Sequence, residues 1–264
     1  MRYLIRSGMD QVEGREMAKD ARGWRSKFAV VAPSTNTIVQ PDMDDFRVRG
    51  VTNHFGRIYV PNMKVSNDDE FVALVEAIGA TLYDAVDRCS TAEPDYLIMG
   101  MSALMFWDGR AASEKRMQEL SDHCGLQVSA GSFACEAALN LTGAKRIAVI
   151  SPYFPISDKN VTLFFQDCGF EVVRFRGLKC SSPVAIAQVQ EDELRAHIAE
   201  MDGDDVDAFV QVGTNLSMCS LCTELETEYG KPFVAINAAT YWHALRAMGI
   251  TDQFSGHGTL FEKH

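Results

Sequence analysis

The sequence predicts an α/β protein of two pseudo-symmetric halves, each a doubly wound parallel sheet, with the functional site in the cleft between them. Three observations support this fold class. Short apolar runs alternate with segments of helical periodicity, a pattern typical of parallel sheets covered by helices. Two stretches of strand and turn occur twice along the chain. The 264 residues, 47% hydrophobic and 23% charged, are enough for a large globular core.

Strands are predicted where apolar runs rich in β-branched residues end in turn residues. These runs cover 27–33, 55–60, 95–101, 146–152, 170–175, 207–213 and 232–237. Apolar residues at helical spacing lie between the runs and predict helices at 69–89, 113–124, 192–201, 221–229 and 240–248.

The internal repeat is visible in the strands and in the turns that follow them. KFAVVAPS at 27–34 corresponds to RIAVISPY at 146–153, and PDYLIMGMS at 94–102 corresponds to VDAFVQVGTN at 206–215. Ligands of doubly wound sheets bind beyond the carboxyl ends of the strands. We therefore expect the site where the turns after these four strands converge, at 33–37, 100–103, 151–154 and 213–216.

The repeat also predicts the domain organisation. Residues 27–134 together with about 238–264 form the first half, and residues 135–237 form the second. The charged and irregular stretch 1–26 precedes them, and we expect this arm to pack on a neighbouring subunit.

The four turns carry small polar residues before helix starts, where backbone N–H groups are unpaired. Together with Ser, Thr and Asn side chains, these groups form sockets for a carboxylate or an oxyanion. Ser and Asn are equally typical of simple helix caps, so both roles stay open for Ser102 and Asn215. The predicted substrate-binding residues are Asn36, Gly100, Met101, Ser102, Tyr153, Gly213, Thr214 and Asn215.

The charge and the cysteines limit the partners and the compartment. A net charge of −11 and a pI near 5.0 argue against binding to nucleic acid or to an acidic membrane surface. The seven cysteines form no disulfide pattern, no secretory start is present, and no apolar run reaches the ~20 residues of a membrane span. We expect a cytoplasmic homo-oligomer, a dimer or larger.

Three motifs resemble those of a known enzyme family. They are APSTNTIVQPDM at 32–43, LIMGMSALMFWDG at 97–109, and the stretch 213–242 with GTNLSMCSLC at its start and GKPFVAIN near its end. The chain resembles the maleate cis-trans isomerase and arylmalonate decarboxylase family within the aspartate/glutamate racemase superfamily.

The resemblance implies a cofactor-independent reaction on a small carboxylate. In that superfamily two cysteines at strand ends face each other across the substrate, and the decarboxylases keep only the second. Here both cysteine positions correspond to glycine, Gly100 and Gly213. What the resemblance does transfer is the anion-holding set of Asn36, Ser102, Tyr153 and the Thr214–Asn215 turn.

The pair Cys219 and Cys222 has several interpretations. A single C-x-x-C without a partner pair is not typical of a zinc site, and we expect no metal. A thioredoxin-like pair would follow the strand directly, whereas Cys219 lies six residues beyond the turn. Packing as small hydrophobes is the alternative. Because a helix start lowers a thiol pKa, Cys219 stays a candidate catalytic residue beside Ser102 and Tyr153.

Two aromatic features have both a functional and a structural interpretation. Phe106 and Trp107 follow the first socket, where they form either an apolar wall for a substrate or part of the core. His257, between two glycines, is either a residue near the cleft or an ordinary loop histidine.

Together these features predict a cofactor-independent enzyme that acts on a small carboxylate or dicarboxylate. An isomerase- or decarboxylase-like lyase working through an oxyanion or enolate intermediate fits the two sockets. A hydrolase on the same scaffold and a non-catalytic carboxylate-binding regulatory protein are the alternatives.

Overall fold

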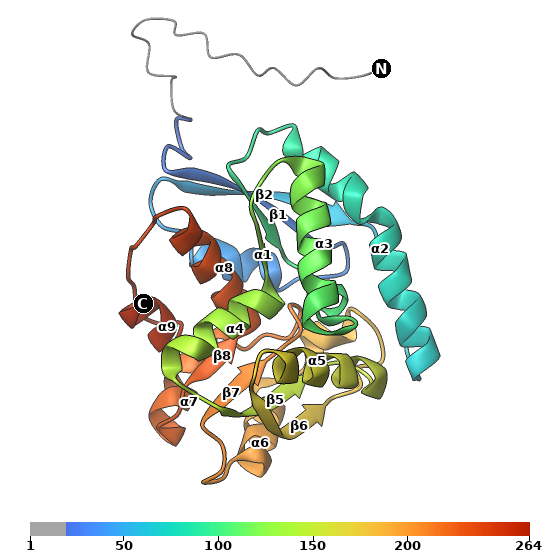
Figure 1. Ribbon diagram of the computed structural model, residues 1–264, viewed down its shortest axis with the longest axis vertical. Coiled ribbons are helices and arrows are strands. Elements are labelled where there is room, and N and C mark those ends of the chain that lie inside the picture. Colours follow the sequence, from blue (N-terminus) through green and yellow to red (C-terminus); the bar gives the residue numbers. More distant parts are fainter. Residues whose placement is uncertain (1–19) are drawn as a thin grey trace, which may run out of the picture.

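Two four-stranded parallel sheets form the centre of the protein in the computed structural model, which describes residues 20–264 (Figure 1). Their strand orders are β2-β1-β3-β4 and β6-β5-β7-β8, so each half has the same topology. The first sheet contains β1 (Ser26–Pro33), β2 (Val51–Ile58), β3 (Tyr96–Met99) and β4 (Val128–Ala130). The second contains β5 (Arg146–Ser151), β6 (Glu171–Gly177), β7 (Ala208–Gln211) and β8 (Phe233–Ala235). The predicted fold class is confirmed.

The strand register brings the predicted turns together. In the first sheet β1 and β3 end side by side, with Val31 opposite Met99. In the second sheet β5 and β7 end side by side, with Ile150 opposite Gln211. Turns from both sheets line one pocket, so the carboxyl ends of the central strands face each other across it.

Helices cover both sheets. They are α1 (Val39–Asp45), α2 (Asp68–Ser90), α3 (Gly109–Cys124), α4 (Gly131–Thr142), α5 (Pro155–Asp167), α6 (Glu191–Met201), α7 (Cys222–Tyr229), α8 (Ile236–Ala247) and α9 (Thr259–Lys263). Three short 3₁₀ helices, η1 (Ala103–Phe106), η2 (Ala185–Gln188) and η3 (Cys219–Leu221), follow strand ends or loops. The N-cap residue of the long helix α2 is Asn67, whose side chain accepts a hydrogen bond from the Glu70 N–H at 2.9 Å.

Hydrogen bonds attach the start of α2 to the second half. The Asp68 carboxylate accepts from the Ile156 N–H at 3.0 Å, and the Val65 N–H donates to the Ser181 carbonyl at 2.8 Å. Helix α2 therefore extends from the first sheet to the boundary between the halves (Figure 1).

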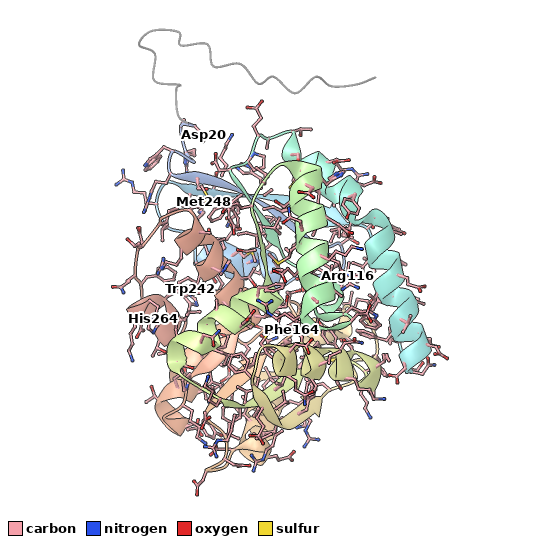
Figure 2. The ribbon with its side chains drawn as sticks, in the orientation of Figure 1. Asp20, Arg116, Phe164, Trp242, Met248 and His264 are labelled. Atoms are coloured by element: carbon pink, nitrogen blue, oxygen red, sulfur yellow. The ribbon has the colours of Figure 1, made fainter. Side chains whose placement is uncertain are left out.

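The core includes the aromatic residues whose role the sequence left open. Phe106 is completely buried, and its ring packs edge-on against the ring of Phe164 at 5.2 Å between centroids. Phe164 lies on α5 and is labelled in Figure 2. Trp107 packs, partly buried, against the same core. His257 packs against the Phe46 ring at 4.8 Å. The structure places all three in packing positions outside the pocket lining.

The sequence also predicted the boundaries of the two halves, the position of the C-terminal segment and an N-terminal arm. Helix α4 packs against α8, so the C-terminal segment joins the rest of the fold at this contact. The boundaries 27–134 with 238–264, and 135–237, stay predictions. Most of the expected arm at 1–26 lies outside the described residues. Among residues 20–264, no helix combines the length and the apolar character needed to cross a membrane.

Candidate active site

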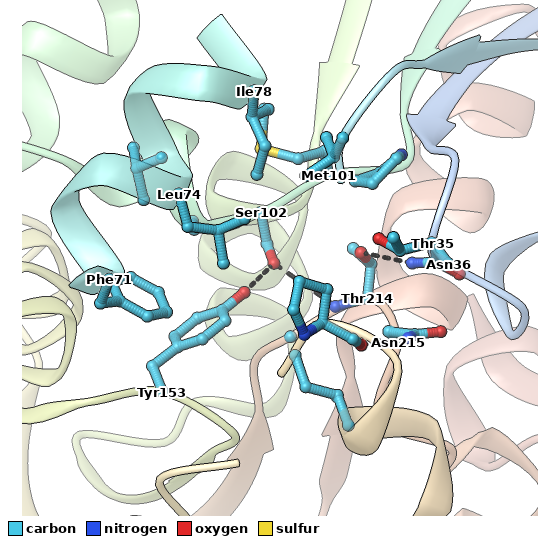
Figure 3. A pocket seen from close by; sticks show the side chains of 17 residues that line it. Thr35, Asn36, Phe71, Leu74, Ile78, Met101, Ser102, Tyr153, Thr214 and Asn215 are labelled. Carbon is cyan, nitrogen blue, oxygen red and sulfur yellow. Dashed lines mark hydrogen bonds between the residues drawn. The ribbon is translucent and has the colours of Figure 1, made fainter. Parts of the chain in front are cut away.

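A small pocket lies between the carboxyl ends of the two sheets and encloses about 60 Å³ (Figure 3). Its lining comes from both halves of the chain. It includes seven of the eight predicted binding residues; the exception is Gly100. The lining residues are Pro33, Thr35, Asn36, Val60, Phe71, Leu74, Val75, Ile78, Met101, Ser102, Ala103, Tyr153, Pro183, Ile186, Gly213, Thr214 and Asn215.

Ser102 and Tyr153 meet at the centre of this pocket, one from each half. Their hydroxyl groups are hydrogen-bonded to each other, and both side chains are buried (Figure 3). The Thr214 N–H donates to the Ser102 Oγ at 3.4 Å. Burial raises the pKa of the Tyr153 phenol well above its usual range, so this hydroxyl keeps its proton at neutral pH.

Residues of β5 and α5 hold the backbone of Tyr153 in place. Its N–H donates to the Ser151 Oγ at 3.1 Å, and the Ser151 hydroxyl donates to Asp158 at 2.6 Å. Burial raises the pKa of the Asp158 carboxyl to about 7. This chain fixes the turn after β5, and with it the position of the Tyr153 ring.

Asn36 and Thr214 join the two halves beside the hydroxyl pair. The Asn36 Oδ1 accepts from the N–H groups of Ile38 and Val39 at 3.0 and 2.9 Å, at the start of α1, whose N-cap residue is Ile38. Its Nδ2 donates to the Thr214 Oγ1 at 3.2 Å. The Thr214 hydroxyl in turn donates to the Gly100 carbonyl at 3.0 Å. These side chains are therefore used mainly to connect the halves.

The Asn215 side chain is also satisfied within the protein. Its Oδ1 accepts from the Thr37 N–H and its Nδ2 donates to the Pro183 carbonyl, both at 2.9 Å. By contrast, the backbone N–H groups of Asn215 and Ser102 donate to no other group within residues 20–264. Two unpaired donors, one from each half, are what an oxyanion site requires.

The two glycines at the cysteine positions leave no space for a side chain. A Cβ on Gly213 would lie 2.4 Å from the Pro152 Cδ, and Gly213 has a φ of +105°. A Cβ on Gly100 would lie 2.8 Å from Val39 Cγ1. Neighbouring side chains therefore occupy the space that a thiol at either position would need.

Cys219 lies outside the pocket lining, in η3. It is buried, and burial together with the charge of Asp42 raises the pKa of its thiol well above the usual range. The lowered pKa expected from a helix start is wrong, because desolvation outweighs the helix dipole. Cys222, also buried, donates its S–H to the Met218 carbonyl at 3.5 Å.

One wall of the pocket was not predicted from the sequence. Helix α2 contributes Phe71, Leu74, Val75 and Ile78 to the lining. Figure 3 shows Phe71 and Leu74 next to the Ser102–Tyr153 pair. Their spacing indicated only an amphipathic helix. None of the residues that line the pocket is Asp, Glu, His, Lys, Arg or Cys. A polar floor without a charged side chain thus faces an apolar wall.

Comparison with known proteins agrees with this architecture. A maleate isomerase of Pseudomonas putida strain KT2440 is 27% identical over 252 residues, which are 89% of this chain and 96% of that protein. A maleate isomerase of Nocardia farcinica is 23% identical over 246 residues, 90% of this chain and 96% of the relative.

Solved structures share the fold. A mutant of the Nocardia farcinica maleate cis-trans isomerase with a covalently bound succinylcysteine intermediate has a TM-score of 0.83 at 18% identity, covering 90% of this chain and 98% of that one. A double mutant of arylmalonate decarboxylase in a liganded form has a TM-score of 0.75 at 20% identity, covering 90% and 99%.

The profile of one enzyme family, arylmalonate decarboxylase, matches residues 65–261, well over half of the chain. The match includes η1, both strand-end turns of the second half and the apolar wall of α2. It confirms the resemblance inferred from the motifs and the expected enzyme class of isomerase or decarboxylase type. The chain belongs to the arylmalonate decarboxylase family.

Proposed function

We propose that the protein is a cofactor-independent lyase that decarboxylates a small malonate-type dicarboxylate. The observation that carries this proposal is the position of the Ser102–Tyr153 hydroxyl pair, at the boundary between a polar floor and an apolar wall. The floor binds the carboxylate that stays, and the wall receives the one that leaves.

The substrate class follows from the two sides of the pocket and from the relatives. The relatives are named for maleate, a dicarboxylate, and for arylmalonate. Unpaired N–H groups of Ser102 and Asn215 suit one carboxylate, which becomes an enediolate. A second carboxylate against Leu74 and Ile78 is deprived of water, which favours its loss as neutral carbon dioxide.

The reaction needs one bond to break and one proton to arrive. The bond between Cα and the desolvated carboxylate breaks, carbon dioxide leaves, and the electron pair moves into the enediolate. The Tyr153 hydroxyl, directly or through Ser102, then gives its proton to Cα, and a water proton restores the phenol. A raised pKa keeps Tyr153 protonated until this step.

The isomerase alternative has less support. The Nocardia farcinica isomerase structure contains a covalent succinylcysteine intermediate, which requires a thiol at the substrate. No cysteine is among the residues that line the pocket here, and the buried thiol of Cys219 has a raised pKa. A proton donor without a nucleophile fits decarboxylation better.

The test is to incubate the protein in D₂O with methylmalonate, ethylmalonate, phenylmalonate and maleate and to follow products by NMR. We expect carbon dioxide release from a malonate with one deuteron at Cα, and loss of turnover in Tyr153→Phe. Tyr59→Phe, which changes an exposed tyrosine, is the matched control. Fumarate from maleate would overturn the proposal in favour of an isomerase, and binding without turnover would favour a regulatory protein.

Oligomeric state and compartment belong to this proposal only as expectations. A homo-oligomer and a cytoplasmic location stay predictions from the sequence, and light scattering on the full chain checks the first.

A further inference from the structure

A buried amide behind the second strand-end turn connects that turn to a carboxylate. Asn237, in the first turn of α8, is 2% exposed. Its Nδ2 donates to the Thr214 carbonyl at 2.9 Å and to the Asp42 Oδ2 at 2.8 Å. Because both partners only accept, both hydrogens of the amide nitrogen are used and the orientation of the amide is fixed.

The other end of this amide has no partner. Within residues 20–264, the Asn237 Oδ1 is buried and accepts no hydrogen bond. A buried unpaired acceptor is unfavourable. The orientation of Asn237 is thus determined by the two bonds of its nitrogen, at the expense of its oxygen.

The Thr214 carbonyl belongs to the same peptide plane as the Asn215 N–H. In a trans peptide the C=O and N–H bonds point in opposite directions. A carbonyl held toward α8 therefore turns the Asn215 N–H away from α8. Asn215 lines the pocket, and its backbone N–H donates to no group within residues 20–264.

We infer that Asp42 is a positioning residue: through Asn237 it fixes the peptide plane that presents the Asn215 N–H to the substrate oxyanion. The Asn215 N–H is one of the two donors that the proposed function uses. Measuring the role of Asp42 by kcat rests on that proposed function, whereas measuring it by hydrogen exchange does not. Asp42 itself does not line the pocket.

The surroundings of Asp42 make its ionisation state matter. Its titratable neighbours are the Cys219 thiol of η3, the Cys222 thiol of α7 and Asp45 of its own helix, while α8 faces it with Asn237. Burial raises the pKa of the Asp42 carboxyl to about 6. An ionised carboxylate accepts a hydrogen bond more strongly than a neutral one. Below about pH 6 the Asn237–Asp42 hydrogen bond therefore weakens, and with it the hold on the Thr214–Asn215 peptide.

The test compares Asp42→Ala and Asp42→Asn with the control Asp45→Asn, which removes the same charge from an exposed position of α1. We expect Asp42→Ala to lower kcat on a malonate substrate by about 10- to 100-fold with a smaller change in KM. In the wild type we expect kcat to fall as the pH is lowered through 6. Asp42→Asn keeps an acceptor that does not titrate, so its kcat should not show this fall. Asp158 is present in all variants, so any effect of its titration is common to them. Asp45→Asn keeps the wild-type kcat at pH 8, where Asp42 is ionised with or without Asp45.

Hydrogen exchange of the 214–216 amides gives a readout that needs no substrate. Faster exchange in Asp42→Ala but not in Asp45→Asn supports the inference even if the wild type turns over no malonate, a result that would remove the proposed function alone. Unchanged exchange and kcat in Asp42→Ala would overturn the inference. If Asp42→Ala does not fold, an Asp42→Asn profile that still falls like wild type below pH 6 would overturn it.

Discussion

The two strand-end turns of the pocket are related by the internal repeat, yet they contribute different groups. The first turn, 100–102, brings the Ser102 hydroxyl into the pocket, where it is hydrogen-bonded to Tyr153. The second turn, 213–215, uses the side chains of Thr214 and Asn215 to join the halves and presents a backbone N–H. One copy of the repeat supplies a side-chain hydroxyl to the pocket, and the other uses its side chains to hold the structure around the pocket together.

Ser102→Ala tests the contribution of the first turn, and we expect it to have the largest effect of these substitutions on kcat. Removing the hydroxyl separates Tyr153 from its hydrogen-bond partner, and we expect kcat to fall about 10²- to 10⁴-fold, the usual range for a proton-transfer group. Steady-state kinetics on the best malonate checks this. An unchanged kcat would mean that Tyr153 protonates the substrate without help from the first turn.

Gly213→Ala tests how rigid the second turn, 213–215, is. The new methyl would overlap with Pro152 at a φ of +105°, and we expect a loss of about 3 kcal/mol in the free energy of unfolding. Urea denaturation measures it. The control Gly143→Ala has a φ of +72° but open space, and should lose only about 1 kcal/mol. Equal losses would mean that Pro152 yields easily.

Asn215→Ala removes the side-chain bonds of the second turn and leaves its backbone in place. The Thr37 N–H and the Pro183 carbonyl lose their partners, which should destabilise the fold by about 2 kcal/mol. We expect a smaller decrease in kcat than for Ser102→Ala, because the Asn215 N–H remains. A kcat loss as large as that of Ser102→Ala would show that the amide side chain contacts the substrate.

Asp42→Asn should change stability in the opposite direction, by an amount that depends on pH. The pKa of Asp42 is about 6 in the folded protein against an ordinary value of 3.8, so the folded state binds more protons between pH 4 and 6. Stability contributed by the neutral carboxyl is lost as pH rises through this window. The variant should therefore be up to about 3 kcal/mol more stable than wild type above pH 6 and equal to it near pH 4.

Thermal unfolding of both proteins from pH 4 to pH 8 measures this difference. A difference that shrinks with rising pH would mean that Asp42 is stabilised by its surroundings when ionised.

Much of the fold was predictable because strongly periodic or strongly apolar segments determine it. The helix expected at 69–89 is α2, and the strands expected at 146–152 and 232–237 are β5 and β8. The short β4 and the helices α1, α4, α5 and α9 were missed. β4 has three residues, and α1 contains Pro41, which suits a first helical turn but reads as a breaker.

The site was predictable at its floor and not at its wall. Small polar residues after apolar strands indicate a ligand-binding turn, which identified Ser102 and Tyr153. Phe71 and Leu74 have the spacing of any core-facing helix, and only the tertiary structure shows that a cavity lies in front of them. Asn237 gave no signal, because its role depends on Asp42, nearly two hundred residues earlier in the chain.

The filled space behind Gly100 and Gly213 has a consequence for protein engineering. Val39 lies against one glycine and Pro152 against the other, so a cysteine introduced alone at either position would overlap with its neighbour and cost stability. Introducing a thiol into this pocket therefore calls for paired substitutions, Gly100 together with Val39 or Gly213 together with Pro152.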